Sequence, residues 1–238
     1  MPRRRQPVMT LLLLVLVAFG ANLAVLFRQG LVPPAVNPLP ALDLATPDPW
    51  FLDWRLAALR HDPGLCRHVL TSPTIVAEAL PDSPLKAGCG WNNAVRVSNV
   101  NGIRAGFDPA TCEAAAALAL WLSHDVAPLA EQMFGERLVS IQSFGSYACR
   151  NIVGNPLWKA IRSEHATANA LDISAFTLAG GRRISVAKHW KGAGVEAQFL
   201  RAAHASACRY FRVVLGPDYN EAHHNHFHLD RGLLGQCK

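Results

Sequence analysis

Alternating apolar and polar positions predict a series of short strands along the last two thirds of the chain. The valines of residues 88–100 alternate with polar residues, and apolar positions recur in the same way further on. The turn Ala179-Gly180-Gly181 between two such segments is typical of a hairpin. The expected strands are residues 88–100, 137–150, 171–176, 183–186, 212–215 and 226–229.

Apolar positions at helical spacing predict three helices among these strands. The helices are expected at residues 50–60, 108–126 and 196–210. The pair Asp108-Pro109 is typical of an N-cap followed by proline in the first turn, so the second helix should begin there. Three aromatic residues of the first helix are expected in the core: Trp50, Phe51 and Trp54. Helices mixed with antiparallel strands indicate an α+β fold, with a small antiparallel sheet and flanking helices.

The first 30 residues carry an uninterrupted apolar run behind a basic start. Residues 8–27 contain no charge, and at about 1.5 Å per residue they could cross a hydrocarbon core of about 30 Å. A cleaved signal peptide usually has a shorter apolar region, and Ala21-Asn22-Leu23 is a poor cleavage site. The arginines before the run favour a cytoplasmic segment 1–7 and a single transmembrane signal anchor at 8–28, with the rest outside the cytoplasm.

Residues 29–49 are expected to link this anchor to a folded domain at 50–238. The linker holds six prolines and shows no apolar period. Such a composition favours an extended, semi-rigid spacer between the bilayer and the domain.

The cysteines indicate an oxidising compartment. All six follow the apolar run, and their even number permits up to three disulfides. We expect one bridge between Cys208 and Cys237, where it would fasten the C-terminal tail.

The distribution of charge argues against a nucleic-acid partner. The formal net charge is +6, but residues 1–30 carry four arginines and no acid. The remainder holds 19 basic residues against 17 acidic ones. Nucleic-acid binding favours a dense basic face, and a nearly balanced domain does not provide one.

Two short stretches carry the side chains with catalytic or metal-binding chemistry. Four of the ten histidines fall within residues 223–228, and His165 and Asp172 lie upstream. Zinc prefers imidazole nitrogen and carboxylate oxygen in a tetrahedral arrangement, with one position left for water. In a strand, residues two apart share a face, so His226 and His228 would point to one side, where one could bind metal and the other face substrate.

These histidines also permit interpretations other than a catalytic metal site. A histidine tract can bind metal adventitiously without catalysis. The string HHNHFH is also similar to a His-Asn-His nuclease, although the balanced charge of the domain does not suit DNA. Five other histidines are interpreted as surface or satisfied core residues: His61, His68, His124, His189 and His204.

The spacing of the polar residues resembles a known enzyme superfamily. The pattern S-x-H-x6-D from Ser163, followed by H-x-H from His226, is similar to the lysostaphin, D-Ala-D-Ala peptidase and hedgehog metallopeptidases. More narrowly, residues 66–237 resemble the bacterial extensin-like C-terminal domain family. The strings that carry this second resemblance are GCGW, SYACR, SEHATANALDI and LGPDYNEAHHNHFHLD.

This resemblance implies roles for individual residues. The implied zinc ligands are His165, Asp172 and His228. His226 and His223 precede the last ligand by two and five residues, as the catalytic histidines of a penicillin-insensitive murein endopeptidase do. Other branches place a carboxylate where Asn225 stands, so the His-x-His branch is the better match. Arg150 would stabilise a developing oxyanion, or else serve as a structural ion-pair partner. Ala168 stands where many relatives have glycine.

The resemblance also implies a function and a place in the cell. It suggests a zinc-dependent hydrolase of peptidoglycan stem peptides or crosslinks, of the endopeptidase or D,D-carboxypeptidase type, anchored in the inner membrane with its domain in the periplasm. The alternative is a non-catalytic, zinc-containing module that binds peptidoglycan or acts as a scaffold. Three acids are candidates to accept hydrogen bonds from the zinc histidines: Glu164, Glu221 and Asp230.

Overall fold

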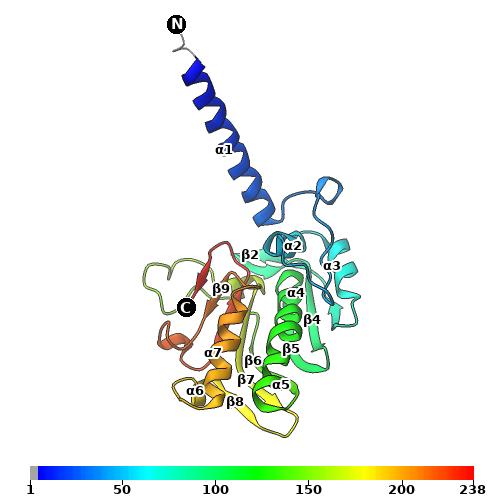
Figure 1. Ribbon diagram of the computed structural model, residues 1–238, viewed down its shortest axis with the longest axis vertical. Coiled ribbons are helices and arrows are strands. Elements are labelled where there is room, and N and C mark those ends of the chain that lie inside the picture. Colours follow the sequence, from blue (N-terminus) through cyan, green and yellow to red (C-terminus); the bar gives the residue numbers. More distant parts are fainter. Residues whose placement is uncertain (1–4) are drawn as a thin grey trace.

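The computed structural model describes residues 5–238, which form a mixed α+β domain with one long helix projecting from it (Figure 1). The helices are α1 (Arg5–Gln29), α2 (Leu52–Ala58), α3 (Pro63–Leu70), α4 (Cys112–Trp121), α5 (Ala127–Phe134), α6 (Val186–His189) and α7 (Val195–Ala207). Short 3-10 helices are η1 (Pro34–Val36), η3 (Glu164–Thr167) and η4 (Glu221–His223). The α+β prediction is therefore confirmed.

The strands form one large sheet and one small one. They are β1 (Ile75–Ala79), β2 (Ser83–Lys86), β3 (Cys89–Trp91), β4 (Ala94–Val100), β5 (Ile103–Thr111), β6 (Leu138–Gly145), β7 (Ala170–Leu178), β8 (Arg183–Ser185), β9 (Val213–Leu215), β10 (Phe227–Asp230) and β11 (Gln236–Cys237). The large sheet has the order β1-β4-β5-β6-β7-β10-β9-β11, with β8 beside β7, while β2 pairs with β3. The pairs β5–β6 and β9–β11 are parallel, so the sheet is larger than expected and not wholly antiparallel.

Helix α4 is buried on every side and lies at the centre of the molecule. A helix that is apolar all round belongs inside a protein, and each residue of α4 is buried. It begins after Thr111, whose hydroxyl accepts a hydrogen bond from the Ala114 N–H. The prediction of a start at Asp108 is wrong, because buried Phe107 and Ala110 continue strand β5 through that point. Asp108 instead pairs with Arg96 on the neighbouring strand.

The helices α4, α5 and α7 cover one face of the large sheet (Figure 1). The expected apolar side of α7 is confirmed, since Phe199 and Leu200 are fully buried. On the sheet side, Phe176 of β7 lies 5.4 Å from Phe199 and 6.2 Å from Phe227, measured between ring centroids. This aromatic contact fixes β7 and β10 against the helices.

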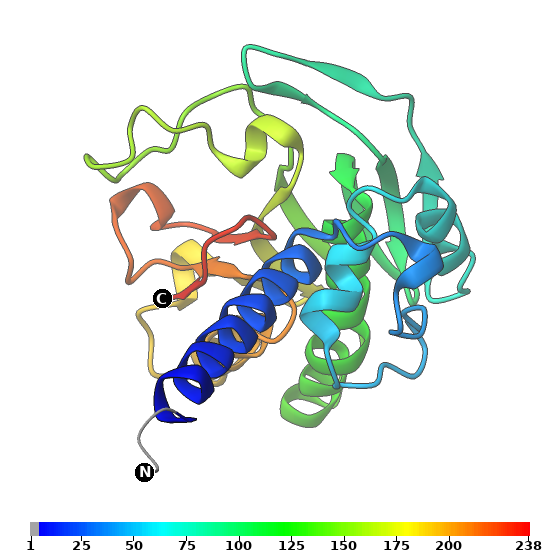
Figure 2. The same cartoon turned by 90° about the horizontal axis from the view of Figure 1, so that it is seen from above.

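A β-bulge in β7 determines which side chains face away from the helices. Ser143 of β6 pairs with Ile173, but Gln142 pairs with Ala175, so one extra residue, Ser174, lies between them. Such a bulge shifts the alternation by one position. Strand β7 can therefore present Phe176 to the helices and, before the bulge, Asp172 to the opposite face. The loops of residues 146–168 lie on that opposite side (Figure 2).

Three disulfides fasten the domain. They are Cys66–Cys112, Cys89–Cys149 and Cys208–Cys237. The last is the predicted bridge, and it ties the end of α7 to β11. The bridge from Cys89 holds the segment that leads to Arg150 and η3.

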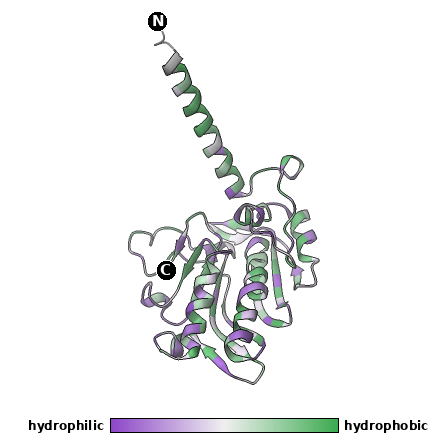
Figure 3. Cartoon of the chain, in the orientation of Figure 1, coloured by the Kyte–Doolittle hydropathy of each residue, from purple (hydrophilic) through white to green (hydrophobic). Residues whose placement is uncertain are grey.

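Helix α1 is apolar along its length and projects from the domain (Figure 3). Its residues Val8–Gln29 are long and apolar enough to cross a membrane, the one such helix in the described part of the chain. The segment after it is not an extended spacer. Leu42 and Leu44 are buried, and the Arg55 guanidinium donates hydrogen bonds to the carbonyl oxygens of Pro40 and Ala41. The part of this segment from Pro40 to Leu44 therefore packs against the domain.

The aromatic residues around α2 differ from the expected core arrangement. Trp50 and Phe51 are 73% and 53% exposed, so their assignment to the core is wrong. Trp54 is half-buried, with its ring stacked between Phe27 at 4.9 Å and Phe51 at 5.2 Å. The aromatic rings around α2 therefore contact the end of α1 through Phe27, and they do not join the core between the helices and the sheet.

Candidate metal centre

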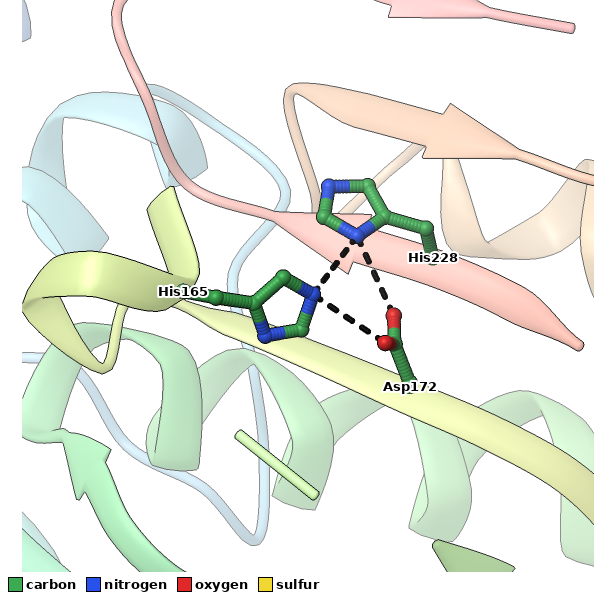
Figure 4. Close-up of side chains that lie close together, drawn as sticks. All are labelled: His165, Asp172 and His228. Carbon is green, nitrogen blue, oxygen red and sulfur yellow. Dashed lines mark hydrogen bonds and ion pairs between the residues drawn. The ribbon is translucent and has the colours of Figure 1, made fainter. Parts of the chain in front are cut away.

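Three buried side chains from three separate elements meet on the face of the sheet away from the helices. His165 comes from η3, Asp172 from β7 and His228 from β10 (Figure 4). Asp172 and His228 are direct cross-strand partners. Their adjacency follows from the register of the two strands, and the face they share follows from the bulge at Ser174.

Local backbone geometry brings His165 to the strands. The Ser163 hydroxyl accepts a hydrogen bond from the His165 N–H and caps η3. Ala168 ends this helix in the left-handed conformation, with φ of 56°. That conformation favours glycine, so a glycine would fit this position with less backbone strain than Ala168 does.

The three donor atoms form a compact triangle. His165 Nε2 lies 3.1 Å from Asp172 Oδ2 and 3.1 Å from His228 Nδ1. His228 Nδ1 lies 3.1 Å from Asp172 Oδ1. Donor atoms at about 2.0–2.1 Å from a tetrahedral zinc ion are about 3.3 Å apart. The triangle therefore has nearly the size that a zinc ion requires.

The outer nitrogens of both histidines are engaged by acceptors, which determines their protonation. His165 Nδ1 lies 3.0 Å from the carbonyl oxygen of Ser146, and His228 Nε2 lies 3.0 Å from Asp230 Oδ2. In the neutral form of each ring the outer nitrogen donates its proton there, and the inner nitrogen is left with a lone pair that faces Asp172 and the other ring. Three acceptors that face one point in a buried site fit a divalent cation.

Of the three candidate acceptors for these histidines, Asp230 contacts one. Glu164 instead accepts a hydrogen bond from the side-chain amide of Asn169, and Glu221 is exposed beside His224. The carbonyl of Ser146 was missed, because a backbone oxygen leaves no signal in the sequence.

Electrostatics keep Asp172 ionised. Burial acts to raise the pKa of this carboxyl, but hydrogen bonds from His165 and His228 outweigh burial and lower it. Burial acts to lower the pKa of His228, but Asp172 and Asp230 outweigh it and raise the value to about 9. A metal ion that binds here displaces the proton held by the histidine pair.

Two further histidines line the edge of the triangle. His226 Nε2 lies 3.5 Å from Asp172 Oδ1, and its Nδ1 lies 2.8 Å from the side-chain oxygen of Asn225. Burial lowers the pKa of His226, and it lowers the pKa of His223 to about 3, with the neighbouring imidazoles adding to the shift. Both rings are thus neutral at physiological pH. Asn225 holds the His226 proton on Nδ1, so Nε2 can accept one.

Arg150 lies beside the same group, at the wall of a cavity. The cavity has a volume of about 780 Å³ and reaches His228 and Asp230. Its other walls include Arg150, Trp158, Tyr219, His223, Leu233 and Leu234. The positive charge of Arg150 contributes to the lowered pKa values of His223 and His226, so it acts on both rings. Within residues 5–238 no carboxylate pairs with Arg150, which disfavours the ion-pair alternative.

The apolar part of this cavity was not anticipated from the sequence. Residues 150–162 and 232–236 form much of its wall, and neither segment has a regular apolar period. Of the histidines expected to be structural, His124 Nε2 contacts the Leu44 carbonyl and His189 Nδ1 accepts from the Ser185 N–H. His204 is buried against Trp190, and its Nε2 lacks a hydrogen bond.

Together the fold and this group define an α+β domain with a buried His-Asp-His cluster of metal-binding chemistry beside a cavity. Residues 64–238 match the family described as Extensin-like protein C-terminus. The match covers most of the chain and every residue of the cluster, and the chain belongs to this family. No curated protein matches the chain, and no solved structure does.

Proposed function

We propose that this protein is a zinc-dependent hydrolase that cleaves peptide bonds in peptidoglycan stem peptides or crosslinks. The observation that carries the proposal is the convergence of three acceptor atoms, His165 Nε2, Asp172 Oδ and His228 Nδ1, at separations of 3.1 Å. The resemblance of the ligand spacing to the lysostaphin and D-Ala-D-Ala peptidase superfamily supports the reaction class and the substrate class.

The chain offers residues suited to each part of a hydrolysis. Zinc bound to the triangle would act as a Lewis acid on the scissile carbonyl and lower the pKa of a bound water. His226 is placed to accept a proton on Nε2, since Asn225 occupies its Nδ1. Arg150 stands at the cavity wall, where its charge suits an oxyanion or a substrate carboxylate. His223 adds a second neutral imidazole, with its ring centroid 5.4 Å from that of His226.

We further propose that α1 anchors the protein in the inner membrane as a single pass, with the domain in the periplasm. The arginines before the apolar run favour this orientation. Three disulfides in the domain suit an oxidising compartment.

The test is mass spectrometry of purified muropeptides after incubation with the zinc-loaded full chain in mild detergent. The informative variant is His226→Ala, which removes the proposed proton acceptor and leaves the three metal-binding side chains in place. The matched control is His224→Ala, because His224 is an exposed neighbour that contacts Glu221 and lies outside the cluster.

We expect new fragments from the wild type and from His224→Ala, and a loss of at least about 100-fold in rate with His226→Ala. Zinc content should be equal in all three proteins. Intact muropeptides with a folded, zinc-loaded wild type would contradict the hydrolase and favour the binding or scaffold module. Cleavage of plasmid DNA that is lost with His228→Ala would favour a nuclease instead.

A further inference from the structure

Helix α1 is fixed to the domain at its C-terminal end. The ring of Phe27 stacks on Trp54, and the Arg28 guanidinium lies 3.7 Å from the Asp53 carboxylate. The Arg212 guanidinium donates a 2.6 Å hydrogen bond to the backbone oxygen of Arg28. These contacts leave no free spacer between the helix and the domain, so the direction of α1 relative to the domain is set (Figure 1).

The apolar length of α1 places its end at the membrane surface. Residues 8–27 span about 30 Å at about 1.5 Å per residue, which equals the thickness of a hydrocarbon core. Of the described side chains in this run, that of Phe27 alone is buried in the protein. When the run fills the bilayer core, Phe27 and the residues that contact it lie at the boundary between acyl chains and headgroups.

Exposed apolar side chains gather around this end of α1. We call five of them the collar: Leu31, Trp50, Phe51, Leu233 and Leu234. Leu31 follows α1 directly, and Phe51 stacks on Trp54, which stacks on Phe27. The backbone oxygen of Leu233 accepts a hydrogen bond from Arg28. Three separate segments thus expose apolar groups around the end of α1.

We propose that the collar lies in the headgroup zone of the bilayer, so that the domain rests on the membrane and the cavity beside the metal-binding group opens at the membrane surface. Tryptophan is favoured at this depth, phenylalanine and leucine are typical of surfaces that lie in the membrane interface, and exposed apolar patches of this kind mark interaction sites. The cavity is included because Leu233 and Leu234 belong both to the collar and to the cavity wall. The Arg28 charge is compatible with this depth, since Asp53 pairs with it.

The position of the cavity at the membrane indicates which substrates can reach it, an inference that rests on the proposed function. A cavity that opens at the bilayer receives peptides carried on a membrane anchor, such as a lipid-linked peptide. Its apolar walls suit the nonpolar part of such a molecule. Peptides held far from the bilayer surface would not reach it, because the domain has no spacer.

The test measures the depth of spin labels on the full chain in vesicles of phosphatidylethanolamine and phosphatidylglycerol. All six native cysteines are in disulfides, so an introduced cysteine is the single free thiol for a nitroxide. The labelled variants are Trp50→Cys and Leu233→Cys, on two different segments of the collar. The control is Lys188→Cys, an exposed residue of α6 at the opposite end of the domain from α1 (Figure 1).

We expect collisions with lipid-soluble oxygen, relative to a water-soluble nickel chelate, to be several-fold more frequent at Trp50→Cys and Leu233→Cys than at Lys188→Cys. Values at either collar position equal to those of the control would overturn the proposal. If Trp50→Cys does not fold, Leu31→Cys takes its place. The depth of the labels does not depend on hydrolysis. A failure of the collar proposal can therefore be told apart from a failure of the proposed function. If the labels at the collar lie at the expected depth but no muropeptide is cleaved, the membrane contact of the collar is supported and only the inference about the substrate is contradicted.

Discussion

Phe227 and His228 are neighbours in β10, yet their side chains enter opposite environments. The ring of Phe227 is fully buried and lies 5.5 Å from Trp190, on the side of the helices. His228 faces the other way and contacts two carboxylates and a second imidazole. The two faces of the sheet therefore differ in what they contribute. The face towards the helices stabilises the fold by burying apolar side chains. The opposite face holds polar acceptor atoms, whose burial does not stabilise the fold in this way.

The difference explains how the polar face can exist. Three acceptor atoms at 3.1 Å repel one another unless a cation or a proton lies between them. Such a cluster weakens a fold, so it has to be held by stability from elsewhere. The aromatic contacts of Phe176, Phe199 and Phe227 hold β7 and β10, and thereby Asp172 and His228, in place.

The largest effect on stability is expected on the helix-facing side. Phe227→Ala removes a fully buried ring and leaves a cavity, which should lower the free energy of unfolding by about 3–5 kcal/mol. Denaturant unfolding of the full chain in detergent, followed by circular dichroism, measures this loss. The control is Phe144→Ala on β6, where the ring is exposed. A change above about 0.5 kcal/mol there would break the contrast between the two faces.

A second prediction concerns the metal-binding side, where the effect should appear in affinity. Asp230→Ala removes the acceptor of the His228 Nε2 proton, so the ring is no longer held in the tautomer that presents Nδ1. Zinc affinity should fall by about 10–100-fold, as it does when such an acceptor is lost. Competition with a coloured chelator measures it. Glu221→Ala is the control, and an equal loss there would show that Asp230 acts only through net charge.

The smallest predicted effect lies in the loop that carries His165. Ala168 has a φ of 56°, a conformation that costs alanine more than glycine, so Ala168→Gly should raise the free energy of unfolding by about 0.5 kcal/mol. The control is Ala166→Gly within η3, where the backbone is ordinary and the substitution should lower stability by about 0.5–1 kcal/mol. Thermal unfolding of both variants gives the comparison. A lower stability for Ala168→Gly would contradict it.

Features encoded by local pattern could be predicted from the sequence. The alternation of Val95, Val97 and Val100 gave β4, and all three are buried. The diglycine turn gave the β7–β8 hairpin, and the apolar side of residues 196–210 gave α7. The H-x-H spacing correctly placed His226 and His228 on one side, where both contact Asp172. Each of these depends on residues close together in the chain.

Features that depend on distant partners were missed. The signal for a helix start at Asp108-Pro109 is genuine in isolation, but strand pairing with β4 overrides it and Thr111 takes the cap. The bulge at Ser174 exists only in register with β6. Residues 30–49 look like a spacer because they hold six prolines and no apolar period, and the burial of Leu42 and Leu44 becomes visible only in the folded molecule.

The most direct test of the central claim is the zinc content and zinc-edge X-ray absorption spectrum of the full chain, beside His228→Ala and His224→Ala. We expect one zinc per chain with nitrogen and oxygen ligands at about 2.0–2.2 Å and no sulfur. Zinc should be lost in His228→Ala and retained in His224→Ala. A folded wild type that binds no zinc, or equal zinc in His228→Ala, would contradict zinc binding by His165, Asp172 and His228.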